Sequence, residues 1–285
     1  MPAGSIFGFL GRNGAGKTTA IKTLMGLLRA DTGSAHVFGV PVTDADSAVG
    51  IRRRIGFVTE DKELYPYMTV EQIIRFTRLF FPKWRRDLEQ RYLEMFELPK
   101  ARKIPDLSKG MRSKLMLLLA IARGAELLIL DEPTDGLDPA ATEDVLRELV
   151  SITGSSGITI FFSSHQLSEV ELIADHVGIV DQGRMVVSGC LDDMKARYQR
   201  VHVVLESVAG PPVRWPEGAE SIRQEGRVVS MLCSHNADAI VEQARSIPPP
   251  AHKGSSSAPV TIRQQGGARL MWRISSMQRC RSALR

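Results

Sequence analysis

Short apolar runs and stretches with helical spacing alternate along the 285 residues of this chain. Residues 5–10 form an apolar run with the length of a buried strand. In residues 18–28, apolar side chains recur three, four and seven positions apart, which is the spacing of one helix face. Further apolar runs predict strands at 55–58, 127–130 and 158–162. The first part of the chain therefore predicts an alternation of buried strands and helices.

Between the second and third of these strands the pattern is helical. Residues 70–80 and 86–96 both show helical periodicity, and a strongly apolar helix is expected after Ser108. The longest apolar run of the chain lies in that third helix and has eight residues, 115–122. A bilayer requires about 20 apolar residues. We therefore expect no segment of this sequence to span a membrane.

The pattern changes after about Tyr198. Residues 201–205 and 227–232 are predicted as strands and residues 237–245 as a helix, which together predict a small αβ region over 199–247. Residues 248–250 are three prolines that interrupt this region, and the Gly, Ser and Pro content that follows is typical of a linker.

Residues 260–285 are rich in arginine, contain no acid and have no periodicity. One interpretation is a basic arm for anionic lipid or nucleic acid, and the other is a disordered or frame-shifted end. The second is favoured because charge runs are usually only solvated. We therefore expect a linker and a disordered tail over 248–285.

This basic end also accounts for the net charge of +5. Residues 251–285 hold seven basic residues, so the other 30 basic and 32 acidic residues leave the rest of the chain at −2. No general basic face is expected there, and nucleic acid is not an expected partner.

The three cysteines form no metal or disulfide pattern, which indicates a reducing compartment. No charged region precedes the first apolar run, so no signal peptide is expected.

The segment between the first strand and the first helix reads GRNGAGKTT and fits the phosphate-loop pattern G-x-x-x-x-G-K-[ST]. Its glycines let consecutive backbone N–H groups point at phosphate oxygens, and the following helix directs its positive end at the same anion. Lys17 is expected to hold the β- and γ-phosphates, and Thr18 to ligate Mg²⁺. The predicted nucleotide-binding residues here are Gly11, Arg12, Asn13, Gly14, Ala15, Gly16, Lys17, Thr18 and Thr19.

Two acids, Asp131 and Glu132, follow the third strand. Parallel sheets bind ligands at the carboxyl ends of their strands. We expect Asp131 to hold Mg²⁺ through its water shell and Glu132 to orient or deprotonate an attacking water. His165 stands out from the other histidines because it ends the next predicted strand after the acid pair.

Taken together and in this order, these motifs resemble the ATP-binding subunit of an ABC transporter. The resemblance covers Gly4 to about Gly189. Its five motifs are Walker A (Gly11–Thr19), the signature (Leu107–Met111), Walker B (Leu127–Glu132), the D-loop (Asp135–Asp138) and the switch histidine His165.

The resemblance implies an α/β fold with a P-loop NTPase core and a mostly parallel sheet over residues 1–198. A helical subdomain is inserted at about 62–123, and the αβ region that follows resembles an accessory domain. The resemblance also implies that Glu132 and His165 are catalytic. Ser108 and the N–H of Gly110 would touch the γ-phosphate held by the opposite subunit.

Three residues depart from the family pattern. Glu60 replaces the usual glutamine, and a carboxylate there is expected to bind Mg²⁺ while adding negative charge near the γ-phosphate. In the signature, Lys109 and Met111 replace the usual glycine and glutamine, while Ser108 and Gly110 are kept. We therefore expect Ser108 and Gly110 to keep the contact with phosphate, and Lys109 and Met111 to change how the activity is tuned.

The beginning of the chain departs further. Family members have about a β-hairpin's length before the phosphate-loop strand, including an aromatic residue that stacks on adenine. Only Met1, Pro2 and Ala3 precede Gly4 here. We therefore expect an N-terminally shortened chain, with weaker nucleotide binding and an uncovered sheet edge.

The function implied is ATP binding and hydrolysis, with ATP and Mg²⁺ as cofactors, that powers a membrane permease. The implied partners are a second ATP-binding cassette, identical or different, and the integral membrane permease. The helical subdomain and residues 65–69 would dock the permease, although its helices could equally be surface helices packed on their own core. The chain would be cytoplasmic and peripheral on the inner face of the cell membrane.

The alternative is a soluble ABC-type regulator or a catalytically impaired ATP-binding module. Such relatives usually carry two cassettes or a long coiled coil, and the sequence has neither.

Overall fold

The computed structural model describes residues 1–42, 45–59, 61, 63–197, 199–204, 219–226, 228–233 and 261–266. The chain divides into two compact units, Met1–Ser188 and Gly189–Arg285. The division falls before the boundary expected at residue 198. Helix α8 (Leu191–Arg197) therefore belongs to the second unit.

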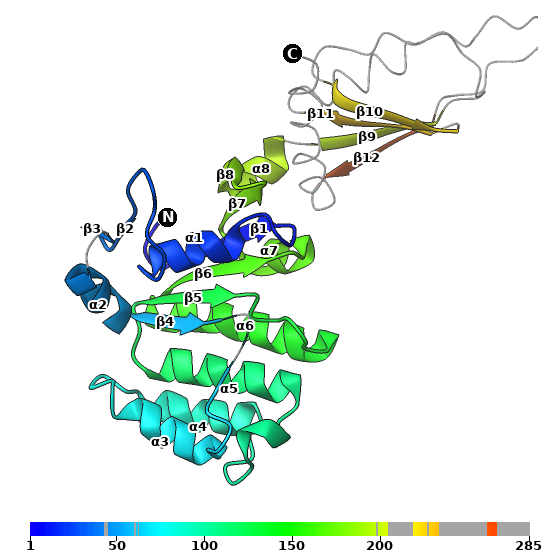
Figure 1. Cartoon of the computed structure of the whole chain (residues 1–285). Helices are drawn as coiled ribbons and strands as arrows, with labels where there is room; N and C mark the ends of the chain where they lie inside the picture. Colours follow the sequence, from blue (N-terminus) through cyan, green and yellow to red (C-terminus); the bar gives the residue numbers. More distant parts are fainter. Residues whose placement is uncertain are drawn as a thin grey trace, which may run out of the picture. The chain divides into compact units, whose positions relative to one another are not determined.

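A six-stranded sheet in the order β4–β5–β6–β1–β7–β8 forms the centre of the first unit (Figure 1). Strands β4, β5, β6, β1 and β7 run parallel. Strand β8 follows β7 after the two-residue turn Gln182-Gly183, whose φ values of 49° and 74° are typical of a tight hairpin. The strands are β1 (Ile6–Gly11), β4 (Ile55–Val58), β5 (Leu127–Asp131), β6 (Thr159–Ser164), β7 (His176–Asp181) and β8 (Arg184–Cys190).

Helices cover both faces of this sheet. Alternation along β1 separates the faces: Phe9 packs with Ala20 of α1 (Lys17–Leu24), and Gly8 faces Val170 of α7 (Leu167–Ile173). A Cβ at Gly8 would lie 2.6 Å from Val170 Cγ1, so the close approach of α7 depends on this glycine. The remaining elements of this part are α2 (Ala45–Arg53), α6 (Pro139–Ser156) and the short pair β2 (His36–Val37) and β3 (Val40–Pro41).

Three helices gather beyond the β4 edge of the sheet (Figure 1). They are α3 (Val70–Arg78), α4 (Arg86–Met95) and α5 (Lys109–Ala122), with a 3-10 turn η1 (Ile104–Asp106) before α5. Helix α3 begins with a capping box, in which Thr69 and Gln72 satisfy each other's backbone N–H groups. The helices predicted at 70–80 and 86–96 are therefore confirmed, each ending within two residues of its predicted end.

The second unit contains a four-stranded antiparallel sheet in the order β10–β11–β9–β12. Strands β9 (Gln199–Val204) and β11 (Val228–Cys233) confirm the strands predicted at 201–205 and 227–232, and β10 (Ala219–Glu225) was not predicted. The helix predicted at 237–245 lies outside the described residues.

Strand β12 (Thr261–Gly266) corrects the prediction of a disordered tail for these six residues. It pairs with β9 from Thr261 opposite Val204 to Gly266 opposite Gln199. The reason is tertiary: an open strand edge offers backbone hydrogen bonds to any extended segment, whatever its local composition. The other residues of 248–285 lie outside the described part of the chain.

Candidate functional site

A glycine-containing loop joins the end of β1 to the start of α1. Gly14 and Gly16 have φ values of 78° and 102°, a conformation that favours glycine. Ala15 N donates to Arg12 O at 3.0 Å, and Gly183 N donates to Ala15 O at 2.9 Å. Because Gly16 is the N-cap of α1, no side chain caps this helix. Its first N–H groups are therefore oriented toward the loop, as an anion site requires.

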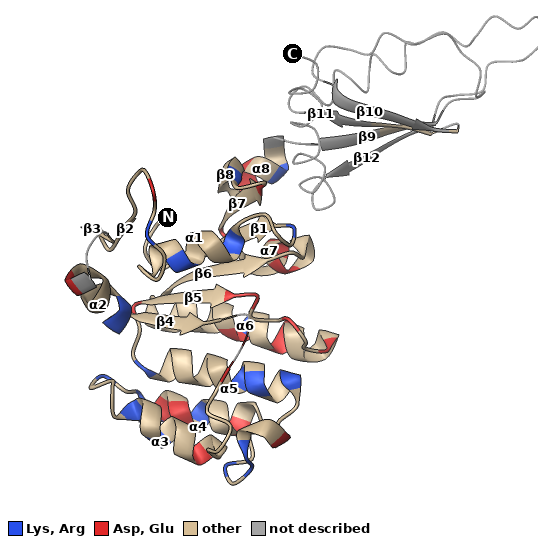
Figure 2. Ribbon diagram, viewed as in Figure 1, with Lys and Arg blue, Asp and Glu red and all other residues tan. Residues whose placement is uncertain are grey.

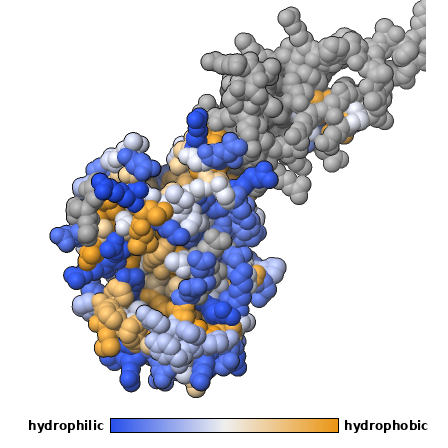
Figure 3. Space-filling model, viewed as in Figure 1, coloured by the Kyte–Doolittle hydropathy of each residue, from blue (hydrophilic) through white to orange (hydrophobic). Residues whose placement is uncertain are grey.

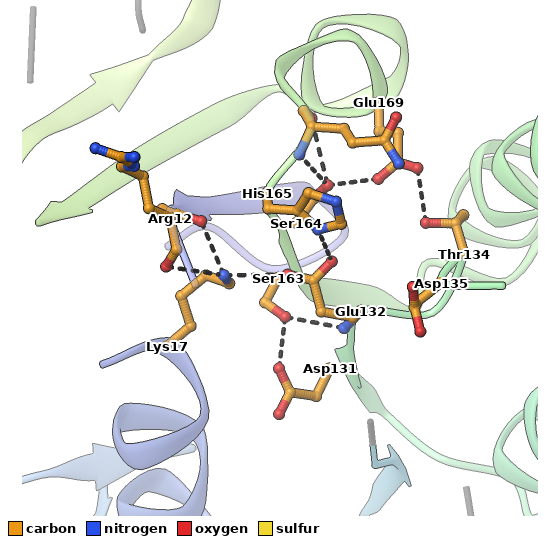
Figure 4. A network of polar contacts seen from close by, with 12 residues as sticks. Arg12, Lys17, Asp131, Glu132, Thr134, Asp135, Ser163, Ser164, His165 and Glu169 are labelled. Carbon is orange, nitrogen blue, oxygen red and sulfur yellow. Dashed lines mark hydrogen bonds and ion pairs between the residues drawn. The ribbon is translucent and has the colours of Figure 1, made fainter. Parts of the chain in front are cut away.

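Lys17 is buried under this loop, with 6% of its side chain exposed. Its Nζ donates to Gly11 O at 2.8 Å and to Arg12 O at 3.4 Å. The same Nζ lies 3.1 Å from Oε1 of Glu132 (Figure 4). The lysine therefore connects the phosphate loop with the acid pair at the end of β5.

The acid pair is held by a serine of the neighbouring strand. Ser163 lies opposite Asp131 in the β5–β6 register. Its Oγ donates to Asp131 Oδ1 at 2.6 Å and accepts from Glu132 N at 2.9 Å. Asp131 is 1% exposed and Ser163 fully buried, so this hydroxyl fixes the Asp131 carboxylate and the Glu132 backbone together.

Glu132 occupies the centre of the cluster. Its φ of 48° is uncommon for a residue with a side chain and is typical of functional turns. His165 Nδ1 lies 2.9 Å from Glu132 Oε2. The other oxygen, Oε1, is buried and accepts no hydrogen bond although Lys17 is nearby, so it has capacity for a further partner.

A second buried glutamate joins the loops that follow β5 and β6. Thr134 Oγ1 donates to Glu169 Oε1 at 2.7 Å, and Ser164 Oγ donates to the other oxygen of the same carboxylate (Figure 4). Ser164 Oγ also accepts from Gln166 N at 2.9 Å, which fixes the chain just beyond His165. Glu169 therefore holds the backbone segments of Glu132 and His165 against each other.

The signature residues lie on a different element. Ser108 is the N-cap of α5, where its Oγ accepts from Met111 N at 3.1 Å and its own proton remains available to donate. Gly110 packs beside the loop after β5, since a Cβ there would lie 3.3 Å from Leu137 Cδ2. Glu60, predicted as a metal ligand, lies outside the described residues.

The donor set at the acid pair fits Mg²⁺ that is shared with phosphate. Among the described residues no group of three or more His, Cys, Asp or Glu could hold a metal alone. Mg²⁺ usually binds through one or two carboxylates together with waters and substrate phosphates. Asp131 and the half-buried Thr18 would supply the oxygens of this chain, and the uncapped α1 would receive the phosphates.

A cleft of about 720 Å³ opens beside the phosphate loop. Gly14, Gly16 and Thr19 form its loop side, and Phe7 and Phe161 form part of an apolar floor, with their rings stacked 5.5 Å apart.

No helix in the described part of the chain has the length and apolar character needed to cross a bilayer.

The structure thus brings together Lys17 of α1, the adjacent Asp131 and Glu132 at the end of β5, and His165 just after β6, as the sequence predicted for a site at one sheet edge (Figure 4). Four polar residues of the cluster were not predicted. Ser163 could have been found from its register with Asp131, but no sequence signal places the others beside the site. The residues missed are Thr134, Ser163, Ser164 and Glu169.

A parallel sheet with a glycine loop, a buried lysine and an acid pair at its carboxyl edge defines a P-loop nucleotide-binding protein. The family model described as ABC transporter matches residues 1–135. A solved ATP-binding subunit of an ABC transporter has a TM-score of 0.62 and 31% identity, covering 68% of this chain and 82% of that one.

Two relatives specify the family. The ABC transporter ATP-binding protein YhaQ of Bacillus subtilis is 36% identical over 212 residues, 73% of this chain and 69% of YhaQ. The bacitracin transport ATP-binding protein BcrA of Bacillus licheniformis is 37% identical over 199 residues, 69% of this chain and 64% of BcrA. The matched region spans about two thirds of the length of these relatives. The chain belongs to the family of ABC transporter ATP-binding proteins.

Proposed function

We propose that this chain binds ATP with Mg²⁺ and hydrolyses it to power transport by a membrane permease. The observation that carries the proposal is the contact of Glu132 with both Lys17, at 3.1 Å, and His165, at 2.9 Å. A carboxylate held between a phosphate-loop lysine and a histidine is suited to activating water beside a phosphate. BcrA, whose name assigns it to bacitracin transport, supports a role in transport.

The roles of the residues follow from their positions. Lys17 and the first N–H groups of α1 bind and neutralise phosphate oxygens. Asp131 and Thr18 hold Mg²⁺, which supplies electrostatic stabilisation of the transferred group when bound. Glu132 orients the water and accepts its proton, and His165 positions the Glu132 carboxylate through Nδ1 and contacts the γ-phosphate.

The completed site needs a second cassette. Ser108 lies at the start of α5, which packs on the β4 edge, whereas the phosphate loop leaves β1, three strands away in the sheet order. Strand spacing is about 4.8 Å, so roughly 14 Å separate the two strands. The sequence has one such signature. A head-to-tail pair, in which each Ser108 reaches the nucleotide of the other subunit, satisfies this geometry.

The permease contact is assigned to the surface around the end of α3. Tyr67, Leu79 and Phe80 are 68%, 79% and 62% exposed. Tyr65 packs at a tilt against Tyr67 and edge-on against Phe76, which in turn meets Phe80 edge-on, so these rings form one aromatic cluster. Figure 3 shows apolar surface over this part of the molecule. Exposed apolar clusters of this kind are typical of protein–protein contacts.

The test is phosphate release from ATP by the purified chain and by two variants. Glu132→Gln should keep nucleotide binding and lose about 10²–10⁴-fold in turnover, the usual effect of removing a general base. Lys17→Ala should weaken nucleotide binding itself, because it removes a charge-assisted contact. Glu143→Gln, on the exposed face of α6, is the matched control and should keep the full rate. Unchanged turnover in Glu132→Gln would show that these roles are wrong.

Partner assembly has its own measurement. Light scattering of Glu132→Gln with ATP and Mg²⁺ should report a dimer, and a persistent monomer at high concentration counts against the head-to-tail pair. Co-purification with a polytopic membrane protein distinguishes a transporter subunit from a soluble regulator.

A further inference from the structure

An ion pair joins the start of α5 to the loop that follows β5. Lys109, the first residue of α5, places its Nζ 2.7 Å from Asp135 Oδ2. The two side chains are 61% and 39% exposed, so the pair lies at the surface. Exposed pairs contribute little to folding stability. Its effect would therefore lie in the relative placement of the two segments that it joins.

Backbone packing brings the same two segments together. Gly136 has a φ of 78°, and a Cβ there would lie 2.3 Å from Lys109 Cδ, so the lysine stem rests directly on this glycine. One residue further along each segment, Gly110 approaches Leu137. The ion pair therefore lies at a close approach of the two segments, which Gly110 and Gly136 allow because they have no side chains.

The charge of Lys109 stands against the helix dipole unless Asp135 is present. A basic residue at a helix N-terminus is electrostatically unfavourable. The first turn of α5 has no acidic residue of its own, and Figure 2 shows basic residues at the start of this helix. Asp135 supplies the negative charge that this helix end favours, although it is distant in sequence. The electrostatics therefore draw the first turn of α5 toward the loop.

That loop is part of the same turn as the catalytic glutamate. Asp135 N donates to Glu132 O at 3.1 Å, and Leu137 N donates to Thr134 O at 3.0 Å. Thr134 is in turn held by the buried Glu169. The Glu132 turn is therefore connected through Asp135 to Lys109, which directly follows Ser108.

We propose that Lys109 and Asp135 are positioning residues that orient the signature segment (Leu107–Met111) according to the state of the Glu132 turn. The proposal rests on the proposed function, in which Ser108 completes the site of a second subunit. Neither residue acts on the nucleotide of its own subunit. The pair adjusts how well Ser108 and Gly110 are presented to the partner, so it affects turnover more than nucleotide binding.

The experiment is a double-mutant cycle with Lys109→Gln, Asp135→Asn and the double variant, read as kcat and KM for ATP. Each single change should lower kcat about twofold to fivefold, the range of an exposed ion pair. KM should change less than twofold, and the double variant should be no slower than either single variant. The charge swap Lys109→Glu with Asp135→Lys should recover much of the lost rate. Arg147→Gln, which breaks the exposed Arg147–Glu143 pair of α6, is the control and should leave kcat unchanged.

Several results would overturn the inference. Additive losses in the double variant would show that the two residues act independently. A loss in Lys109→Gln with none in Asp135→Asn would show that Lys109 acts alone, for example on an anion. If the unsubstituted chain hydrolyses ATP and these variants match it, only this inference fails. If the unsubstituted chain releases no phosphate, the proposed function fails with it.

Discussion

Lys17 Nζ lies 3.1 Å from Glu132 Oε1, and no more than 7% of either side chain is exposed. A buried lysine needs a nearby negative charge, because desolvating an unpaired ammonium is costly. In the structure Glu132 supplies that charge. The proposed γ-phosphate would supply it when nucleotide is bound, which frees Glu132 to act on water. Binding of a γ-phosphate by Lys17 would therefore require the Lys17–Glu132 contact to change.

Glu132→Gln is expected to lower thermal stability when nucleotide is absent and much less when it is present. Breaking a buried ion pair costs up to about 3–5 kcal/mol. The loss here should be smaller, because Lys17 also donates to Gly11 O and Arg12 O. Melting temperatures of wild type and variant, with and without saturating ATP and Mg²⁺, measure the effect. If saturating nucleotide does not narrow the difference in melting temperature between the wild type and the variant, the proposed exchange of Glu132 for the γ-phosphate at Lys17 is contradicted.

Ser163→Ala is expected to destabilise the fold and weaken the response to Mg²⁺. The change removes the hydroxyl that serves both Asp131 Oδ1 and Glu132 N, and it leaves two buried polar groups unsatisfied. Each such group costs about 1–3 kcal/mol. Denaturant unfolding measures the stability, and Mg²⁺ titration of ATP turnover measures the metal response. Ser151→Ala, on the exposed side of α6, is the matched control and should be close to neutral.

Tyr92→Phe tests the contact between α4 and α6. The Tyr92 hydroxyl donates to Glu148 Oε1 at 2.5 Å, and Arg91 Nη2 also lies 3.0 Å from that oxygen. Burial raises the pKa of Tyr92, so the hydroxyl stays protonated and remains a donor. The substitution should lower the free energy of unfolding by about 1–3 kcal/mol, since Glu148 is buried. Tyr67→Phe, at an exposed tyrosine, should have no measurable effect, and equal losses in both variants would refute the assignment.

Two glycine-to-alanine changes should have opposite signs. A Cβ at Gly56 would lie 2.4 Å from Ala120 O, so Gly56→Ala should force α5 away from β4 and destabilise by about 1–3 kcal/mol or more. Gly154 lies on the exposed side of α6 with no atom within 4 Å of an added Cβ. Gly154→Ala should stabilise by about 0.5–1 kcal/mol, because alanine is the better helix former. Chemical denaturation of both variants checks the two signs.

The part of the site that sequence predicts best is the part made by short motifs. Gly16 and Lys17 are fixed by a local turn, and Asp131 and Glu132 by the end of one strand, so their chemistry is readable from adjacent residues. Glu169 is different, because it becomes a site residue only when the loops after β5 and β6 lie side by side. Strand β12 was missed for the same reason, since its partner β9 lies about sixty residues earlier. The local sequence pattern does not say which distant segments of the chain will lie side by side.

The central place of β1 has a consequence for how this protein is made. Strand β1 leaves the ribosome long before its two neighbours, β6 and β7, which lie more than 150 residues later, with Ile6 opposite Ile160 and Phe7 opposite His176. At about 5–20 residues per second, the wait lasts roughly 10–30 s. The hydrogen bond from Gly183 to Ala15 comes later still. A nascent chain that has not yet reached β6 and β7 therefore holds a nucleotide motif without a nucleotide site, and its apolar β1 needs protection until these two strands are made.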